Sequence, residues 1–392
     1  MQYNLTLYGN PFGCDESTNN TTEKDVALSQ IIAYAQPNIL CVNELRDQNI
    51  WANRILNNVL NAEGNLWSRA DLSAQFTNSS IVNGFFYRED LFSLHDQDVV
   101  SQSLSGDALI RPIDLYTLFF DTPELLSGDT LFFTCIVAHL SAGDEVERSA
   151  QTAALMARLD ELGAGNYIFS GDLNIDSALE EAFQNLVSPQ NEDIALIDPV
   201  PLPNQWNNNP AVAQYHTQST RFSDTNSGCF SGGGLDDRFD ITLISPSIQE
   251  GTAGLQYIAG SYEVLGQNGN DYNQELQVFM NGVVPDGIAL ALYEMSDHLP
   301  VLTEYSSDIL SGLVTSNTLP FDVFIDQDGR IQISLHNSGP YEVQILDLSG
   351  RQILLEAFNG IAFQTSIGPL SSGLYVMRVT GNGQQAVKKL MR

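Results

Sequence analysis

Asp297 and His298 stand side by side in the sequence and are followed by an apolar run, Leu299 to Leu302. A carboxylate can bind a metal ion or orient a phosphate, and an imidazole titrates near neutral pH, where a general base must work. The apolar run predicts a short buried strand that would hold both side chains at its end. An Asp-His pair alone also occurs in many surface loops, so its meaning depends on which other polar residues can meet it.

Five more polar residues stand at the ends of strand-like apolar runs: Asn4, Glu44, His139, Asp172 and Asn174. Carboxylates are natural ligands of a hard cation such as Mg²⁺, and an Asp with an Asn amide can bind both a metal and a phosphoryl oxygen. Taken singly, each motif has an ordinary alternative. Glu44 can be a solvated strand exit, His139 a structural histidine, and the Asp172–Asn174 pair an Asx turn. Taken together, they predict a hydrolytic metal site.

Asp240 lies between Phe239 and Ile241 in another apolar run. An unpaired carboxylate would be costly to bury in a strand, so Asp240 needs a partner. A histidine that it orients is a good candidate. Pairing Asp240 with His298 would create the carboxylate–imidazole dyad of a general base.

In their order along the chain, these residues resemble the motifs of the endonuclease/exonuclease/phosphatase family, which includes DNase I-like nucleases, inositol polyphosphate phosphatases and bacterial sphingomyelinases. The resemblance covers roughly residues 1–305. The matching residues are the opening Asn4, Glu44, His139, Asp172 and Asn174 of the Gly-Asp-x-Asn motif, Asp240, and Asp297 and His298 of the terminal Ser-Asp-His motif. The resemblance implies an α/β fold, a DNase I-like sandwich of two sheets flanked by helices, with the site at one rim.

The family mechanism would place a divalent ion, Mg²⁺ or Mn²⁺, on Glu44 with Asp297 as a further ligand, and it leaves a separate Ca²⁺ site open. His298, oriented by Asp240, would activate a water molecule for in-line attack on a phosphodiester.

Five other residues receive supporting roles from the same resemblance. His139, Asn4 and Asn174 would stabilise the developing charge and the leaving oxygen. Arg46, from a Glu-x-Arg spacing typical of the nuclease branch, and Arg148 are expected to contact substrate phosphates. Arg148 has the alternative of a surface capping residue at the start of a helix.

The family pattern is incomplete at one place. In DNase I-like nucleases a glutamate partners the first histidine, whereas the corresponding segment Ser80–Asn83 offers no carboxylate. The resemblance therefore favours phosphodiester hydrolysis in general over DNase I-type cleavage of DNA.

The charge of the chain is strongly asymmetric. The 392 residues carry a formal net charge of −32, and 43% of them are hydrophobic. Residues 317–392 contain equal numbers of acidic and basic side chains, so the whole excess lies in residues 1–316, where Lys24 is the only lysine. Such a surface favours solubility and opposes tight, sequence-independent binding of a polyanion, although a bound cation can supply positive charge locally.

Cysteine use and the ends of the chain bear on its location. Cys41 and Cys135 lie in apolar runs and are expected to be buried free thiols, whereas Cys14 and Cys229 lie in Gly/Ser/Asn-rich loops and could pair if those loops meet. Strand-like sequence begins directly after Met1. We therefore expect that an export signal has been removed or that the start is truncated.

Two domains are expected. Residues 1–305 alternate strand-like runs with amphipathic helices, one of them opened by a Thr22–Asp25 capping box. The Pro/Asn/Gln/Ser/Gly-rich segment 189–235 is expected to be a long functional loop, with a disordered insertion as the alternative. Residues 306–319 are expected to be a linker. Residues 320–392 read as strands throughout and predict a small all-β sandwich.

The last 73 residues resemble a type A sorting domain of the type IX secretion system of Bacteroidetes. The matching segments are residues 343–351, Leu370–Tyr375 and the basic pair Lys388-Lys389. The resemblance implies contact with the type IX secretion machinery and a secreted or cell-surface protein. A small carbohydrate- or protein-binding sandwich is the alternative.

These features predict a secreted, monomeric, divalent-metal-dependent phosphodiesterase, with an extracellular nuclease acting on DNA or RNA as the favoured form. A phospholipid hydrolase or a sugar or inositol phosphate hydrolase is the enzymatic alternative. The aromatics Trp206, Tyr215 and Phe222 are expected to be exposed, where they could contact a nucleic acid or one of these other substrates. A catalytically silent binding protein is the alternative from another class. The chain contains no run of 18 or more apolar residues, so the sequence predicts no membrane span.

Overall fold

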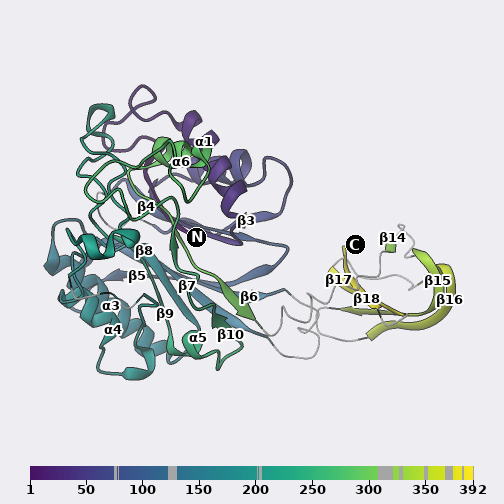
Figure 1. Cartoon of the computed structure of the whole chain (residues 1–392). Coiled ribbons are helices and arrows are strands. Elements are labelled where there is room, and N and C mark those ends of the chain that lie inside the picture. Colours follow the sequence, from purple (N-terminus) through teal and green to yellow (C-terminus); the bar gives the residue numbers. More distant parts are fainter. Residues whose placement is uncertain are drawn as a thin grey trace. The chain divides into compact units, whose positions relative to one another are not determined.

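The computed structural model describes residues 1–74, 77, 79–121, 130–200, 202, 205–307, 321–325, 330–347, 352–366, 374–381 and 384–391. The chain forms two compact units (Figure 1). The first comprises Met1–Asp121 and Leu131–Asp308, and the second contains the strands of residues 321–391. Residues 308–319 of the expected linker lie outside the described part of the chain. No helix among the described residues has the length and apolar character needed to cross a membrane.

One sheet of the first unit has six strands. Their spatial order is β11 (Glu263–Val264), β12 (Val301–Leu302), β1 (Gln2–Tyr8), β2 (Ile39–Arg46), β4 (Ile81–Arg88) and β3 (Trp67–Arg69). Strands β1 and β2 are parallel and the other pairs are antiparallel. The two parallel strands are almost wholly buried, including the polar residues Gln2, Asn4 and Thr6 that alternate with the apolar residues of β1.

The second sheet has five strands in sequential order. They are β5 (Phe92–Gln102), β6 (Ala108–Phe120), β7 (Phe132–His139), β8 (Tyr167–Asp172) and β9 (Asp240–Ile244). Strands β1 and β2 pack on β7, β8 and β9 of this sheet, and the Phe85 and Tyr116 rings stack between the sheets at 4.3 Å. The predicted α/β sandwich of two sheets is therefore confirmed.

Helices cover the sandwich on both sides (Figure 1). Helix α3 (Glu145–Leu162) packs on β5, β6 and α4 (Glu181–Val187), with a shared apolar core. On the other side α1 (Thr21–Ala35) packs against α6 (Asp286–Met295) and η1 (Ile55–Leu60), which follows α2 (Asn49–Arg54). Short elements complete the unit: η3 (Glu192–Ile194), η4 (Pro210–Tyr215), η5 (Asn226–Gly228), α5 (Pro246–Glu250), β10 (Leu255–Tyr257) and β13 (Tyr305–Ser307).

The start of α1 differs from the expected capping box. The N-cap is Asn20, whose side chain accepts hydrogen bonds from the backbone amides of Thr22 and Glu23. Asp25 is buried instead, where it accepts a hydrogen bond from Tyr8 and pairs with Arg54 at 2.8 Å. The carboxylate of Asp25, which the sequence pattern assigned to the helix cap, thus forms a tertiary ion pair with Arg54 instead.

The segment 189–235 is a series of anchored turns rather than a loop that exposes its aromatics. Trp206 is 1% exposed, and its Nε1 donates to the Ile175 carbonyl at 2.9 Å. Its ring meets Phe183 edge-on in the core beneath α4. Tyr215 packs against the same core, so among the three aromatics only Phe222 is exposed. The expectation of exposed aromatics is wrong for Trp206 and Tyr215.

The second unit is an all-β unit, as predicted. Its strands are β14 (Phe321–Ile325), β15 (Arg330–Asp347), β16 (Gln352–Ser366), β17 (Leu374–Gly381) and β18 (Gln384–Met391), all antiparallel in one sheet. The register between β15 and β16 shifts between Ser334 and Gly339. Alternate residues from both halves of β15 join Met377 and Val379 in a single buried cluster.

Candidate active site

The site lies where strands of both sheets end, beside an irregular stretch of β1. The β1–β2 register shifts between Asn4 and Tyr8, and Thr6 and Leu7 have positive φ angles of 44° and 53°. Glu44 on β2 also has a positive φ, 58°. Such conformations are costly for residues other than glycine and persist where the surroundings hold them, as at functional sites. They turn the Glu44 side chain to the backbone amide of Leu7, which donates to Oε2 at 2.9 Å.

His298 and Asp240 form the dyad that the sequence predicted. Nδ1 of His298 lies 2.6 Å from Oδ2 of Asp240, and both side chains are buried. Burial alone would lower the pKa of His298, but the carboxylates of Asp240 and Asp172 outweigh it and raise that pKa well above its ordinary value. Asp240 is the first residue of β9 rather than a mid-strand residue. The dyad leaves Nε2 of His298 facing the other site residues.

Asn4 connects this dyad to the carboxylates. Its buried Nδ2 donates to Oδ2 of Asp172 at 2.9 Å and lies 3.3 Å from Oε1 of Glu44. The same amide lies 3.4 Å from Nε2 of His298. When His298 is deprotonated and keeps its remaining proton on Nδ1 toward Asp240, Nε2 can accept a hydrogen bond from this amide. One side chain from β1 therefore joins residues from β2, β8 and the segment before β12.

Glu44, His139 and Asp172 form a group that can hold a metal ion. Their ligand atoms all lie within 4.8 Å of one another. Nε2 of His139 is 3.4 Å from Oδ2 of Asp172 and 4.0 Å from Oε1 of Glu44. Two carboxylate oxygens and an imidazole nitrogen are a donor set that divalent cations accept. The residues present therefore fit the metal that the resemblance implies.

The protonation states of His139 and Asp172 agree with a role as metal ligands. Burial, followed by the nearby charges of Arg111 and His298, lowers the pKa of His139 well below its ordinary value, so its imidazole is neutral. Burial raises the pKa of Asp172 to about 7; His298 opposes the rise, while Asp240 and Glu44 add to it. A buried carboxylate among other carboxylates is a position where a cation would relieve the repulsion.

Asn174 follows the strand that ends at Asp172. Its backbone amide donates to Oδ1 of Asp172 at 3.1 Å, and its own Nδ2 donates to the Leu140 carbonyl at 3.1 Å. The Asx turn that was the ordinary alternative is thus present, and it leaves Oδ2 of Asp172 directed at Asn4 and His139. Asn174 is half-buried at the edge of the group.

Asp297 lies beside the metal-binding group but not within it. Its Oδ1 accepts a hydrogen bond from the Thr6 hydroxyl, and its Oδ2 accepts from the backbone amide of Ser231 at 2.7 Å. Oδ1 also lies 3.9 Å from Nε2 of His298. Both oxygens therefore already accept hydrogen bonds from neighbouring elements.

The two arginines expected to contact phosphate have different surroundings. Arg46 is half-buried, and its Nη1 donates to the Gly9 carbonyl at 3.1 Å, next to Glu44. Arg148 is 3% exposed, pairs with Glu180 at 2.7 Å and donates to the Ser141 carbonyl at 3.0 Å. Because its guanidinium is buried and fully engaged, the expectation that Arg148 contacts substrate is wrong. Its alternative as a surface residue is also wrong.

The sequence reasoning missed Arg111 on β6. Its Nη1 donates to the Leu140 carbonyl at 2.7 Å, and burial lowers its pKa although Glu44 and Asp172 pull that pKa upward. Arg111 and His139 line one pocket together with Ile81, Val82, Asn83, Pro112 and Asp114. A charged residue directly before a proline in the apolar run 108–120 was the available signal.

The same pocket holds a buried carboxylate near the place where the family's glutamate is missing. Asn83 of β4 donates to Oδ2 of Asp114 at 2.9 Å, and Ser73 donates to the other oxygen. Burial raises the pKa of Asp114 to about 6, while these two hydrogen bonds lower it. β6 thus supplies a carboxylate that Ser80–Asn83 does not.

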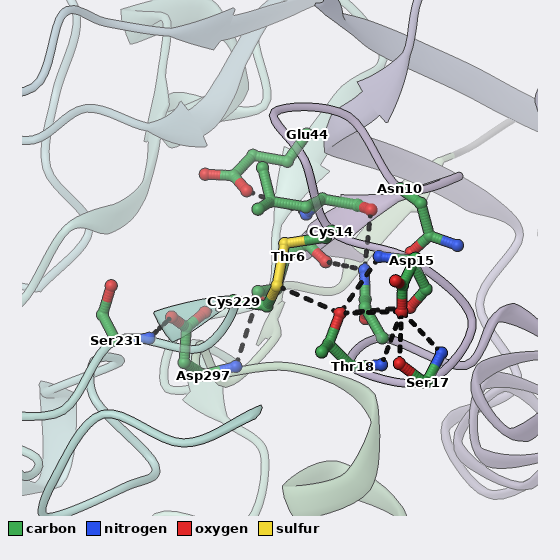
Figure 2. Close-up of a disulfide and its surroundings, with 12 residues drawn as sticks. Thr6, Asn10, Cys14, Asp15, Ser17, Thr18, Glu44, Cys229, Ser231 and Asp297 are labelled. Carbon is green, nitrogen blue, oxygen red and sulfur yellow. Dashed lines mark hydrogen bonds between the residues drawn. A yellow bond between two sulfur atoms is a disulfide. The ribbon is translucent and has the colours of Figure 1, made fainter. Parts of the chain in front are cut away.

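A disulfide lies close to the site (Figure 2). Cys14 and Cys229 are joined, with Cα atoms 6.0 Å apart, while Cys41 and Cys135 are buried free thiols as expected. The pairing that the sequence left open is therefore formed. Disulfides are typical of proteins that leave the cytosol.

A family model matches the C-terminal part of the chain. Residues 327–392 match the family described as secretion system C-terminal sorting domain. The sequence therefore ends in a sorting domain that directs export through the type IX secretion machinery, and the protein is located at the cell surface or in the extracellular space. No curated protein matches the chain.

Solved structures align with the remainder of the chain at low identity. The human nocturnin catalytic domain is 17% identical over 73% of this chain and 87% of its own, with a TM-score of 0.44. An endonuclease/exonuclease/phosphatase family protein from Bacteroides thetaiotaomicron is 15% identical over 78% and 96%, with a TM-score of 0.46. A mannosyl-6-phosphatase from the same organism is 16% identical over 78% and 98%, with a TM-score of 0.46. At this identity the chemistry has to be identified from the geometry of the site itself.

Proposed function

We propose that the protein is a secreted, divalent-metal-dependent phosphodiesterase whose catalytic domain comprises residues 1–305. The observation that carries the proposal is the meeting of a His298–Asp240 dyad with the Glu44, His139 and Asp172 group through one Asn4 amide. A basic imidazole beside a cation-binding carboxylate group is the combination that hydrolysis of a phosphate ester needs. A silent binding protein would have no use for it.

In the proposed hydrolysis, each residue of the site has its own role. With Asp240 holding Nδ1, Nε2 of His298 accepts the proton of an attacking water, and the resulting imidazolium is stabilised by the Asp240 carboxylate. The amide of Asn4 orients Asp172 and faces the same nitrogen, while Asn174 at the edge of the group can meet a phosphate oxygen. A divalent ion held by Glu44, Asp172 and His139 would polarise the phosphoryl group and stabilise its developing negative charge.

Arg111 and Arg46 complete the site as the phosphate-contacting cations. Ten basic residues lie in residues 1–316, and most of them are already engaged. Lys24, Arg221 and Arg238 are buried, and carboxylates pair with Arg54, Arg69, Arg88, Arg148 and Arg158. Of the remaining two, Arg46 lies next to Glu44 and Arg111 lines a pocket with His139, and neither forms an ion pair with a described residue.

This distribution decides how a substrate is held. A protein that follows a long nucleic acid backbone needs a track of Lys and Arg, because phosphate contacts dominate such binding. Two arginines suit the scissile phosphate and one neighbour. We propose a nuclease that binds one or two phosphates of DNA or RNA at the site. The small number of cations also favours a second candidate, a hydrolase of small esters such as sugar phosphates.

The test is hydrolysis by the purified full-length protein, compared with His298→Ala. The substrates are supercoiled plasmid, a labelled RNA oligonucleotide, sphingomyelin vesicles and a sugar phosphate, each with Mg²⁺, with Mn²⁺ and with EDTA. We expect metal-dependent cleavage of the nucleic acids that His298→Ala reduces by roughly 10²- to 10⁴-fold. Cleavage of the sugar phosphate alone would replace the nuclease with the second candidate. If folded protein hydrolyses none of these substrates, the proposed function is wrong.

A further inference from the structure

Two loops far apart in the sequence border the site and are joined by the Cys14–Cys229 disulfide. The first, which we call the Cys14 loop, is residues 9–20 between β1 and α1; the second, the Cys229 loop, is residues 219–234 before β9. The two cysteines are 215 residues apart. Both loops are rich in Gly, Ser, Thr and Asn, which form turns readily but supply few apolar anchors. The disulfide is therefore the covalent constraint on both.

The Cys14 loop holds Glu44 through Leu7. The backbone amide of Leu7 donates to Oε2 of Glu44 at 2.9 Å, and the Leu7 carbonyl accepts from Nδ2 of Asn19 in the loop at 2.9 Å. At its other end the loop offers the Gly9 carbonyl to Arg46. A displacement of this loop would move the peptide that orients a candidate metal ligand.

The Cys229 loop holds Asp297. The backbone amide of Ser231, two residues from Cys229, donates to Oδ2 of Asp297 at 2.7 Å, and that of Thr220 donates to the Asp297 carbonyl at 2.9 Å. The other Asp297 oxygen accepts from Thr6, next to Leu7. Figure 2 shows Glu44, Thr6 and Asp297 around the disulfide. The two loops thus hold neighbouring carboxylates through one covalent link.

The Cys229 loop also has a noncovalent anchor. Phe230 is 2% exposed, with the Arg221 guanidinium 4.1 Å and the Lys24 ammonium 4.9 Å from its ring centre. Arg221 belongs to the same loop and Lys24 to α1, so this packing joins the loop to the body of the fold without the disulfide. Reduction should therefore loosen the segments around Cys14 and Cys229 while the sandwich stays folded.

We infer that Cys14 and Cys229 are positioning residues, whose disulfide keeps Glu44 in place as a ligand of the divalent cation and holds Asp297 beside it. The inference rests on the proposed function, since it concerns the same site. Its consequence is that the site is incomplete in a reducing cytosol and is completed after export, when the disulfide forms.

The experiment reduces the full-length protein reversibly. Dithiothreitol gives up two electrons and becomes its cyclic disulfide, and the Cys14 and Cys229 sulfurs each gain a proton. After removal of the reagent under anaerobic conditions, two properties are measured. They are Mn²⁺ binding by isothermal titration calorimetry, and hydrolysis of bis(4-nitrophenyl) phosphate against Mn²⁺ concentration. Circular dichroism follows the fold, and reoxidation closes the cycle.

We expect reduction to weaken Mn²⁺ binding at least fivefold and to raise the Mn²⁺ concentration for half-maximal rate in parallel, with reoxidation restoring both. The Cys14→Ser/Cys229→Ser variant should bind Mn²⁺ as weakly as the reduced protein does, and dithiothreitol should not change its Mn²⁺ binding. The matched control is Cys135→Ser, which should keep the full response. Wild-type protein alone suffices if the double variant does not fold.

The possible failures are distinct. Equal Mn²⁺ binding in folded oxidised and reduced protein overturns the inference, whatever the hydrolysis shows. If Mn²⁺ binding depends on the disulfide but the oxidised protein hydrolyses no phosphate ester, the proposed function fails and the positioning role stands.

Discussion

At the scale of single residues, the site depends on groups whose ionisation is set by burial among like charges. Asp240 reaches only His298 with one oxygen, and its other oxygen has no partner among the described residues. His139 and His298 are both buried, yet their pKa values move in opposite directions because the carboxylates act more strongly on His298. Opposite shifts suit two histidines with different roles, one a neutral ligand and the other a base.

The pH dependence of hydrolysis should report His298. A base works only when deprotonated, and its pKa is raised, so kcat/KM should rise with pH through a limb above the ordinary histidine range. Asp240→Asn removes the strongest of the raising charges. The limb should therefore move to lower pH while the maximum falls by roughly 10²-fold or more. A pH profile of kcat/KM for both proteins checks this, and an unmoved limb would contradict the dyad.

Arg111 and Arg148 offer a matched comparison between a site cation and a structural one. Arg111→Ala should lower kcat/KM by roughly 10²-fold, because a phosphate contact is lost, and should reduce the free energy of unfolding less than Arg148→Ala does. Arg148→Ala should destabilise the fold by about 3–5 kcal/mol, because Glu180 loses its buried partner, while the folded fraction keeps its activity. Steady-state kinetics and urea unfolding of both variants separate the two roles. The reverse pattern would show that Arg148 contacts substrate.

At the scale of elements, strand β1 is held in its irregular shape by a helix. Lys24 of α1 is 2% exposed and is the only lysine of residues 1–316. Its Nζ donates to the carbonyls of Leu5, at 2.7 Å, and Thr6. These carbonyls lie at the start of the positive-φ stretch Thr6–Leu7. One buried ammonium thus satisfies two backbone groups that the distorted strand cannot pair in a sheet ladder.

The stability of the protein should carry the signature of this lysine. Burial lowers the pKa of Lys24 to about 7, although Asp297 and Glu44 raise it. Between that pH and the ordinary lysine range the unfolded chain binds more protons, so this contribution to stability grows as pH rises. From pH 6 to pH 9 wild type should gain roughly 2–3 kcal/mol relative to Lys24→Met. Urea unfolding of both proteins at the two pH values tests this. A pH-independent difference would mean that Lys24 keeps an ordinary pKa.

At the scale of the whole molecule, an acidic first unit is combined with a sorting domain that carries no net charge. The excess of −32 lies entirely in residues 1–316, and four surface arginines there are paired with carboxylates. Long-range attraction of a polyanion is therefore weak, and binding depends on local contacts at the site. This charge pattern fits an enzyme that works outside the cell on short or accessible phosphoesters.

The salt dependence of nuclease activity follows from that charge pattern. With Arg46 and Arg111 as the phosphate contacts, a plot of log kcat/KM against log salt should have a slope of about −1 to −2. Arg111→Ala should reduce the slope by about one. The measurement is cleavage of a labelled oligonucleotide between 50 and 500 mM NaCl at saturating Mg²⁺. A slope much steeper than −2 would reveal a cationic track formed by other parts of the protein.

The sequence by itself determined the fold class and the two-unit organisation, and it predicted most of the residues that the structure brings together around Asn4. Strand and helix periods are local properties, and polar residues at the ends of apolar runs stand out in one dimension. This is why Asn4, Glu44, Asp172, Asp240 and His298 could be named before their contacts were known. Local pattern was also enough to predict a separate all-β unit at the end of the chain.

Only the tertiary structure decided which polar groups face the site and which pair with other residues away from it. From the sequence, Arg148 is expected to contact a substrate phosphate and Asp25 to cap a helix, but Glu180 and Arg54 pair with them instead. Trp206 lies in a polar segment yet fills the core. Arg111 and the Cys14–Cys229 pair gain their meaning from residues far away in the chain. Burial and partners depend on long-range packing, which the order of residues does not reveal until the two sheets are closed on each other.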